Sequence, residues 1–429
     1  MMSRPATRTV DLAALINVLQ QRATVLNLVG RNEEALAGIV RALRLARAGG
    51  AAELEANCLA QSGEICSFVN RYDLMMERTE AALAAYRRLG HRKGESLALN
   101  NIACVHDIRG DYPRALDCHQ RALAIREEIG DLLGQATSLN NIGFIHDMLG
   151  DRREALSYHL RSLELNRRIG DRGGEACSLH NIGFLHKSAG DYPAALEHFT
   201  VSLEISSRIG DRQGQAYNLE NLGASYADLG DLPRALQSLR KAAATRQEIG
   251  DTDYLAGDRC AIGRLLLQQG ETIQARALIE LAAQAGAAID DVQVTIRIST
   301  ALADLALAEG DRVQAGMHLD RALELSREME YREGIAECRR LRGRVSAAAR
   351  DYDGAAAEFA AALKMYTDMK QQYDMALTHV DLGKMLRAAD DRGAAEEHIR
   401  KALALFRGMN LLYRAAWAEA ALEGPSRTT

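Results

Sequence analysis

The chain has 429 residues, of which 47% are apolar and 26% charged, so it is too apolar for a disordered protein. Its formal net charge is −5, which gives it no overall basic character for binding nucleic acid. No stretch reaches the roughly 18 uncharged apolar residues of a membrane helix, and the first ten residues lack the apolar segment of a signal peptide. The seven cysteines form no CxxC pair, which favours free thiols in a reducing compartment. The sequence therefore predicts a cytoplasmic protein that binds neither nucleic acid nor membranes.

Glycine marks an internal repeat along most of the chain. Thirteen of the 35 glycines stand at positions that are multiples of ten, namely Gly30, Gly50, Gly90, Gly110, Gly130, Gly150, Gly170, Gly190, Gly210, Gly230, Gly250, Gly270 and Gly310. Small residues recur every 40 residues, as Ala115, Ala155, Ala195, Ala235, Ala275, Ala315, Ala355 and Ala395. Such a fixed spacing is typical of a solenoid built from one repeated unit.

Each copy predicts two amphipathic helices separated by a turn. In the copy that spans 134–172, one face of the first helix carries Leu139, Ile142, Gly143 and His146, and the second helix buries Ala155, Leu156, His159, Ser162 and Leu163. Gly150 can end the first helix in the left-handed conformation, and Asp151 can cap the second. The predicted pairs begin near residues 11, 52, 93, 134, 174, 214, 254, 291, 332 and 372. A last helix over 411–422 is expected to cap the array, with loose tails at 1–9 and 424–429.

These small and large positions resemble the tetratricopeptide repeat over essentially the whole chain. The period of 40 is longer than the usual length of about 34, and His106, His146 and His186 replace the common aromatic residue. The Ile-Gly-Asp linkers are similar to those of kinesin light chain, Pins-type adaptors and bacterial signalling proteins. The resemblance implies an all-α, right-handed superhelical solenoid of about ten antiparallel helix pairs in one domain, 10–423.

One position on the first helices, facing away from the core, carries a side-chain amide in six consecutive copies. These residues are Gln21, Gln61, Asn101, Asn141, Asn181 and Asn221. An amide both donates and accepts hydrogen bonds, so a row of amides can bind the backbone of an extended peptide. The resemblance implies the same, because first helices of the family line the concave groove.

Three large apolar residues, Phe144, Phe184 and Met148, are expected to form an exposed patch beside the amides. Two alternatives remain open for the amides themselves. They could cap neighbouring loops, or they could have been duplicated with the repeat without a role of their own.

The later copies, over 251–410, carry charges on the same face. Arg264, Arg344 and Lys384 occupy the position of Phe144, and Asp304 occupies it in one copy. This pattern indicates a basic end of the groove that would bind acidic side chains or a C-terminal carboxylate. A charged face that is merely solvated is an equal alternative.

Histidines occupy matching places in two hairpins, as His106 with His119 and His146 with His159. They stand where aromatic residues are usual, which favours packing over a metal site, and their burial would make stability fall as the pH falls. No GxxxxGK[ST], HExxH or GxSxG motif occurs, so neither catalysis nor a cofactor is predicted.

The sequence thus predicts a scaffold or adaptor that binds an extended peptide or partner segment in its groove. The main alternative is a sensor that receives a signal peptide and switches a separate kinase, cyclase or protease. An enzyme with an unrecognised site on the histidine-rich face and self-association through the end repeats are also left open.

Overall fold

A computed structural model describes residues 11–286 and 291–423, which form 21 helices and the turns between them. The chain divides into two compact units, 1–178 and 179–429, with the boundary inside α9 (Arg172–Ser188). The remaining helices of the first unit are α1 (Leu12–Leu28), α2 (Asn32–Ala48), α3 (Ala52–Ser67), α4 (Tyr72–Leu89), α5 (Arg92–Ile108), α6 (Tyr112–Glu128), α7 (Leu132–Met148) and α8 (Arg152–Ile169).

The second unit continues the same alternation to the last described helix. Its helices after α9 are α10 (Tyr192–Ile209), α11 (Arg212–Leu229), α12 (Leu232–Ile249), α13 (Thr252–Gln268), α14 (Thr272–Gly286), α15 (Val292–Ala308), α16 (Arg312–Glu328), α17 (Arg332–Ala348), α18 (Tyr352–Asp368), α19 (Gln372–Ala388), α20 (Arg392–Gly408) and α21 (Leu412–Glu423). The predicted tails, 1–9 and 424–429, lie outside the described residues, and the prediction of one continuous domain stays a prediction.

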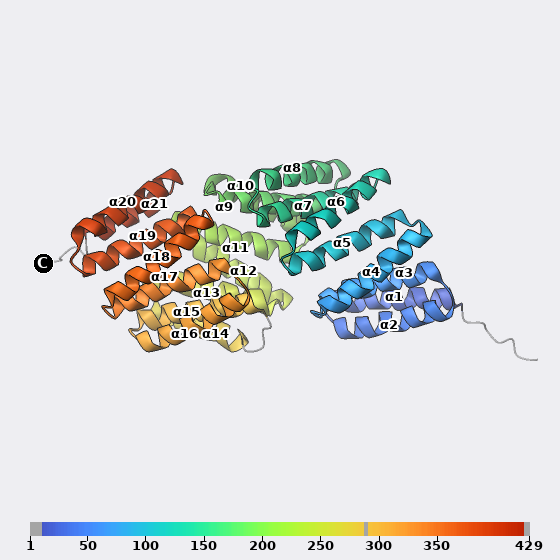
Figure 1. Ribbon diagram of the computed structural model, residues 1–429, viewed down its shortest axis with the longest axis horizontal. Coiled ribbons are helices and arrows are strands. Elements are labelled where there is room, and N and C mark those ends of the chain that lie inside the picture. Colours follow the sequence, from blue (N-terminus) through green and yellow to red (C-terminus); the bar gives the residue numbers. More distant parts are fainter. Residues whose placement is uncertain (1–10, 287–290, 424–429) are drawn as a thin grey trace, which may run out of the picture. The chain divides into compact units, whose positions relative to one another are not determined.

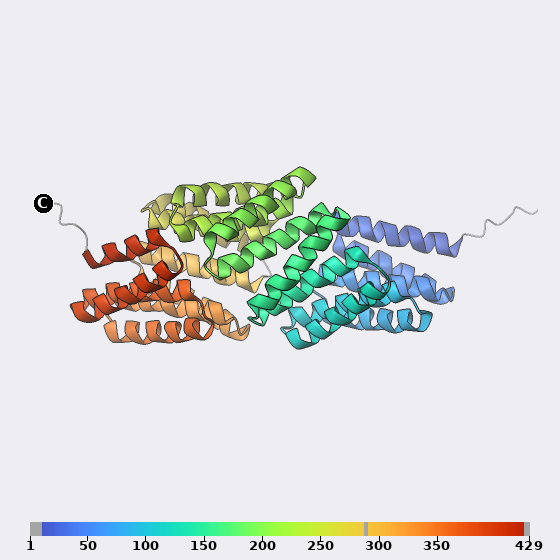
Figure 2. The ribbon, with the colours of Figure 1, turned by 90° about the horizontal axis from the view of Figure 1, so that it is seen from above.

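Within each unit the helices pack as consecutive antiparallel pairs, and several first helices, such as α13 and α15, also touch the first helix of the next pair (Figure 1). The same stacking is seen from above in Figure 2. Each first helix begins within two residues of the predicted position, and the cores lie between the two helices of a pair and between neighbouring pairs. The prediction of an all-α solenoid of helix pairs is confirmed. None of the described helices is both long and apolar enough to cross a bilayer.

The turns explain the spacing of the glycines. All thirteen glycines at multiples of ten adopt a left-handed conformation, with φ between 65° and 84°. Six other multiples of ten take the same conformation without glycine, at Asn70, Glu330, Arg350, Lys370, Asp390 and Asn410. An aspartate often follows and caps the next helix, as Asp131 does by accepting a hydrogen bond from the backbone N–H of Gly134 at 3.0 Å. The predicted left-handed turns are therefore confirmed, whereas Asp151 precedes α8 without the side-chain cap that was predicted for it. All seven cysteines, which lie in the described part, are free thiols.

Small residues on the first helices allow close packing against the second helices. A methyl group at Gly143 would lie 2.9 Å from Cε1 of His159, and one at Gly343 would lie 2.7 Å from Cε1 of Phe359. A methyl group at Gly183 would likewise lie 2.9 Å from Cε1 of Phe199. The side chain sixteen residues further along thus fills the space that a Cβ would need.

This packing predicts opposite effects for the same substitution at two helical glycines. Gly343→Ala should destabilise the second unit by roughly 1–3 kcal/mol, because the buried Phe359 ring has no space to move. Gly316→Ala in α16 should instead stabilise it by up to about 1 kcal/mol, because no atom lies within 4 Å of the added methyl and alanine favours helix. Urea unfolding followed by circular dichroism measures both. Equal effects at the two positions would contradict this account of the small residues.

Candidate functional site

The predicted contact residues lie on the first helices of both units. In the first unit, Gln21, Gln61, Asn101 and Asn141 lie on α1, α3, α5 and α7, and Phe144 and Met148 follow on α7. In the second unit, Asn181 and Phe184 lie on α9, Asn221 on α11, Arg264 on α13, Arg344 on α17 and Lys384 on α19. Gln21 is exposed and the other amides are half-buried. The predicted apolar residues are exposed, Phe144 to 43%, Phe184 to 44% and Met148 to 47%.

Two amides of the first unit connect neighbouring first helices. The Gln61 side chain donates to the backbone oxygen of Gln20 at 2.9 Å. The Asn141 side chain donates to Oδ1 of Asn100 at 3.1 Å, so that α7 is joined to α5. Both bonds link residues 41 positions apart, which is one repeat plus one residue. These amides therefore stabilise the stacking of repeats, a role that the sequence analysis did not anticipate.

Hydrogen-bonding capacity remains on this surface of the first unit. Within 11–286 and 291–423, no hydrogen-bond partner is found for the side chain of Asn101. Asn141 uses one N–H toward Asn100, and an amide offers two N–H groups and two lone pairs. In the second unit, Asn221 donates to the backbone oxygen of Tyr217 in its own helix at 3.1 Å. Amides and large apolar side chains are thus presented together on the first helices.

The charged residues of the second unit form ion pairs between first helices. Arg264 on α13 lies 3.0 Å from Asp304 on α15 and 2.8 Å from Glu337 on α17, and Arg344 lies 2.7 Å from Asp304. Although burial opposes its ionisation, these arginines hold the pKa of Asp304 below its usual value. The ammonium of Lys384 lies 4.5 Å from the centre of the Trp417 ring. Arg264 and Arg344 are already paired with carboxylates, so they do not form the free basic surface that was expected, and their contact with a partner stays a prediction.

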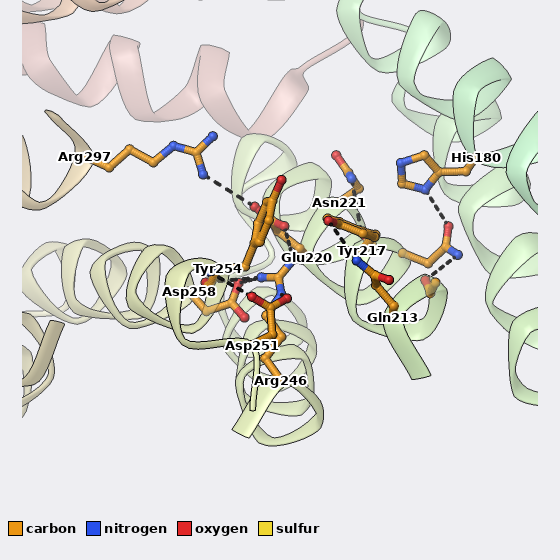
Figure 3. A network of polar contacts seen from close by, with 12 residues as sticks. His180, Gln213, Tyr217, Glu220, Asn221, Arg246, Asp251, Tyr254, Asp258 and Arg297 are labelled. Carbon is orange, nitrogen blue, oxygen red and sulfur yellow. Dashed lines mark hydrogen bonds and ion pairs between the residues drawn. The ribbon is translucent and has the colours of Figure 1, made fainter. Parts of the chain in front are cut away.

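A second polar network surrounds Arg246 on α12, which is only 1% exposed (Figure 3). Its guanidinium contacts Glu220 on α11 at 2.6 Å and Asp258 on α13 at 2.5 Å. The rings of Tyr217 and Tyr254 lie over it, with centroids 5.4 and 4.9 Å away. Burial raises the pKa of Asp258 to about 7, although Arg246 opposes the shift.

The outer part of this network reaches the surface. Arg297 on α15 lies 3.9 Å from Glu220, two first helices away, and Tyr254 is exposed to 39%. Tyr217 meets Tyr254 edge to face at 5.2 Å and lies one turn before Asn221. Neither these tyrosines nor Glu220 was predicted from the sequence. The signal that could have found them is the pair of tyrosines at 217 and 254, which lie in the first two turns of neighbouring first helices.

The histidines pack inside their hairpins, as expected, but with different partners. His146 stacks on Tyr158 at 5.3 Å, whereas Nδ1 of His159 lies 2.9 Å from Oδ1 of Asn140. His119 is buried, and its Nδ1 has no hydrogen-bond partner. In the described part of the chain, no group of three or more His, Cys, Asp or Glu residues is placed to hold a metal ion.

Comparisons with known proteins place this arrangement among repeat proteins. Family models for the tetratricopeptide repeat match residues 97–129, 133–208 and 219–249. No curated protein sequence matches the chain.

Several solved structures share the fold at low sequence identity. A Rap protein complexed with Competence and Sporulation Factor is 13% identical, with 88% of this chain and 99% of that chain covered and a TM-score of 0.55. The quorum sensor NprR from B. thuringiensis is 12% identical, with 92% and 99% covered and a TM-score of 0.52. A signal-transduction ATPase with a tetratricopeptide-repeat sensor from Pyrococcus horikoshii is 15% identical, with a TM-score of 0.55, and the match covers 73% of this chain and 47% of that one.

Proposed function

Because this chain is a tetratricopeptide-repeat protein, we propose that it binds an extended peptide or partner segment on its first helices. Stacked helical repeats present long surfaces to partners, and binding proteins of this kind use those surfaces rather than a single pocket. The protein would act as a scaffold or adaptor without catalysis of its own.

The observation that carries the proposal lies in the first unit, on α5 and α7. Asn101 has an unused amide within the described residues, Asn141 keeps part of its capacity, and Phe144 is 43% exposed one turn after Asn141. Amides can pair with the backbone of any extended peptide, and an exposed aromatic ring gives an apolar side chain of that peptide a place to pack. The bond between Asn141 and Asn100 holds the two helices in register and uses only one N–H of Asn141. It therefore stabilises this surface and leaves hydrogen-bonding capacity for a peptide.

A double substitution in the first unit tests this proposal. Twelve-residue peptides are first selected from a random library on the immobilised wild-type protein. The double variant Asn101→Ala with Phe144→Ala should then bind the selected peptides at least tenfold more weakly, a loss of about 1.4 kcal/mol. Fluorescence anisotropy measures this affinity. Neither substitution removes a described hydrogen bond, so the helical signal should stay unchanged.

The chain offers a matched control on its second helices. Gln120 on α6 is exposed and Leu160 on α8 is 48% exposed, so Gln120→Ala with Leu160→Ala removes the same kinds of group from the other helices. The control should leave affinity within twofold of wild type. If every selected peptide bound the two double variants equally well, the first helices of this unit would not be the binding surface.

A second candidate function is a sensor that binds a signal peptide and then acts on a separate kinase, cyclase or protease. The fold shared with the Rap complex and with the quorum sensor NprR over most of this chain favours it. In a sensor, the bound peptide changes the affinity for the effector, whereas in a scaffold it does not. Titrating a purified effector with and without a selected peptide separates the two.

A further inference from the structure

The last described helix, α21, contacts a helix that lies almost half the chain earlier. Nε of Arg414 donates to the backbone oxygen of Asp228 at 3.1 Å, and Nη2 donates to that of Ala227 at 2.7 Å. These two carbonyls belong to the last turn of α11, where that of Ala227 also accepts a hydrogen bond from the backbone N–H of Gly230 at 3.0 Å. Arg414 is only 8% exposed and therefore caps α11 from 186 residues away.

Aromatic and apolar side chains surround this contact. The Arg414 guanidinium lies 5.9 Å from the centre of the Tyr373 ring and 5.6 Å from that of Trp417. Phe406, Leu411 and Ala415 from the end of the chain share one buried cluster with Tyr192 of α10, and Leu229 of α11 packs against it. Cation–π contacts and apolar burial thus add to the hydrogen bonds.

Two turn glycines fit closely against the end of the chain. A methyl group at Gly230, after α11, would overlap the ring of Tyr413, and one at Gly190 would lie 3.1 Å from Cγ of Met409. Among the other left-handed glycines the added methyl would have no atom within 4 Å, as at Gly250 and Gly210. The turns at 190 and 230 therefore receive the end of the chain, whereas the equivalent turns elsewhere are open.

A half-buried acid lies beside the same contact. The carboxyl group of Asp228 faces the hydroxyl groups of Tyr192 and Tyr373, with Lys187 and Arg414 also nearby. These residues come from α9, α10, α19 and α21, so the start and the end of the second unit meet at Asp228. Separating them would expose these polar groups to water.

From this geometry we propose that α21 is a releasable latch that closes the second unit by joining its last repeat to α11. It is the shortest described helix, with 12 residues, and it contacts the end of α11 through Arg414 and through Tyr413 at the turn of Gly230. Release frees the end of α11 while the helix pairs between α11 and α20 keep their own cores. The latch limits access of a partner to the first helices of this unit, a consequence that rests on the proposed function.

Hydrogen exchange of the full chain, without any ligand, tests the latch independently of that function. Gly230→Ala should accelerate amide exchange at least tenfold in α21 and in residues 224–231, while α13 to α18 stay protected. Gly250→Ala is the matched control, because φ is +82° at Gly230 and +73° at Gly250, so both carry left-handed strain but only Gly230 meets Tyr413. Equal exchange in the two variants, or exchange that rises throughout α11 to α20, would overturn the latch.

A second pair of variants removes the arginine instead. Arg414→Gln should reproduce the faster exchange of α21. Arg400→Gln should not, because Arg400 pairs with Glu396 at 3.1 Å on the exposed surface of α20 and the pair does not involve α21. Peptides that bind the first helices of the second unit should bind Gly230→Ala at least threefold more tightly than Gly250→Ala. Faster exchange without tighter binding would leave the latch standing and refute its effect on partners.

Discussion

Lowering the pH from 7 to 4 should destabilise the first unit by about 3 kcal/mol for each of two buried histidines, His119 and His159. Burial lowers the pKa of both to about 4, and for His119 the nearby Arg126 adds to the effect. Both rings are at most 3% exposed, so a proton taken up at either one would be a charge inside the helical hairpin.

The direction of this effect follows from the order of the two pKa values. In the unfolded chain a histidine takes up its proton near pH 6.5, well above the folded value of about 4. Above pH 6.5 both states are neutral and stability is complete. Between pH 6.5 and pH 4 only the unfolded state binds the proton, so stability is lost progressively across that window.

The repeat itself supplies variants that remove this acid sensitivity. Leu319 and Phe199 stand at the equivalent positions of other copies, where Leu319 packs with Ala303 and Phe199 lies against Gly183, as His159 lies against Gly143. His119→Leu with His159→Phe should therefore fold, and its free energy of unfolding should fall less than that of wild type between pH 7 and pH 4.5. Urea unfolding at several pH values measures this. Parallel pH profiles for the two proteins would show that these histidines are not the acid-sensitive groups.

Arg246→Met should lower the stability of the second unit by about 3–5 kcal/mol, because it leaves the buried carboxylate of Asp258 without its partner and leaves Glu220 only the more distant Arg297. Asp258 is fully buried beside Arg246, and Glu220 is the second acid in contact. The loss should be larger at pH 8 than at pH 5. With Arg246 present, burial already raises the pKa of Asp258 to about 7. Without Arg246 this pKa rises further, because the nearby positive charge is lost. At pH 5 the folded variant can therefore hold Asp258 in its neutral form.

Arg126→Met is the matched control for this substitution. Arg126 occupies the same place in its repeat and is 3% exposed, but it donates to Ser138 at 2.7 Å and to the backbone oxygen of Gly134 at 2.9 Å. Removing an arginine that is bound to neutral groups leaves no buried charge behind, so the change should stay within about 1 kcal/mol. Hydrogen exchange of the helices around each site reports the stability of each unit separately. Similar losses at both positions would contradict the role assigned to Asp258 and Glu220.

The fold could be predicted from the sequence because its signals are local. Glycine at a left-handed turn, aspartate at a helix start and small residues on one helical face each act within about 20 residues. The same turn also forms at Arg350 and Lys370, where no glycine signals it. There the helices on either side impose the conformation, which a local pattern does not record. The division between residues 178 and 179 has no counterpart in the repeat pattern either.

The candidate site was predicted less completely, because its contacts depend on how neighbouring repeats are oriented. The exposure of Phe144 was predicted from the sequence, but the bond between Asn141 and Asn100 was not, because its offset of 41 differs from the repeat length. Arg264 and Glu337 are 73 residues apart and meet across an intervening first helix. Such residues come together only through the stacking of the repeats. The surface that was predicted to be basic therefore consists of ion pairs in the structure.

Photo-crosslinking of a selected peptide tests the central claim most directly. A twelve-residue peptide selected on the wild-type protein carries a photoreactive group, and mass spectrometry maps the crosslinked residues on the full chain. Binding by the first helices predicts crosslinks on α5 and α7, around Asn101, Asn141 and Phe144. Crosslinks confined to the second helices would contradict that claim.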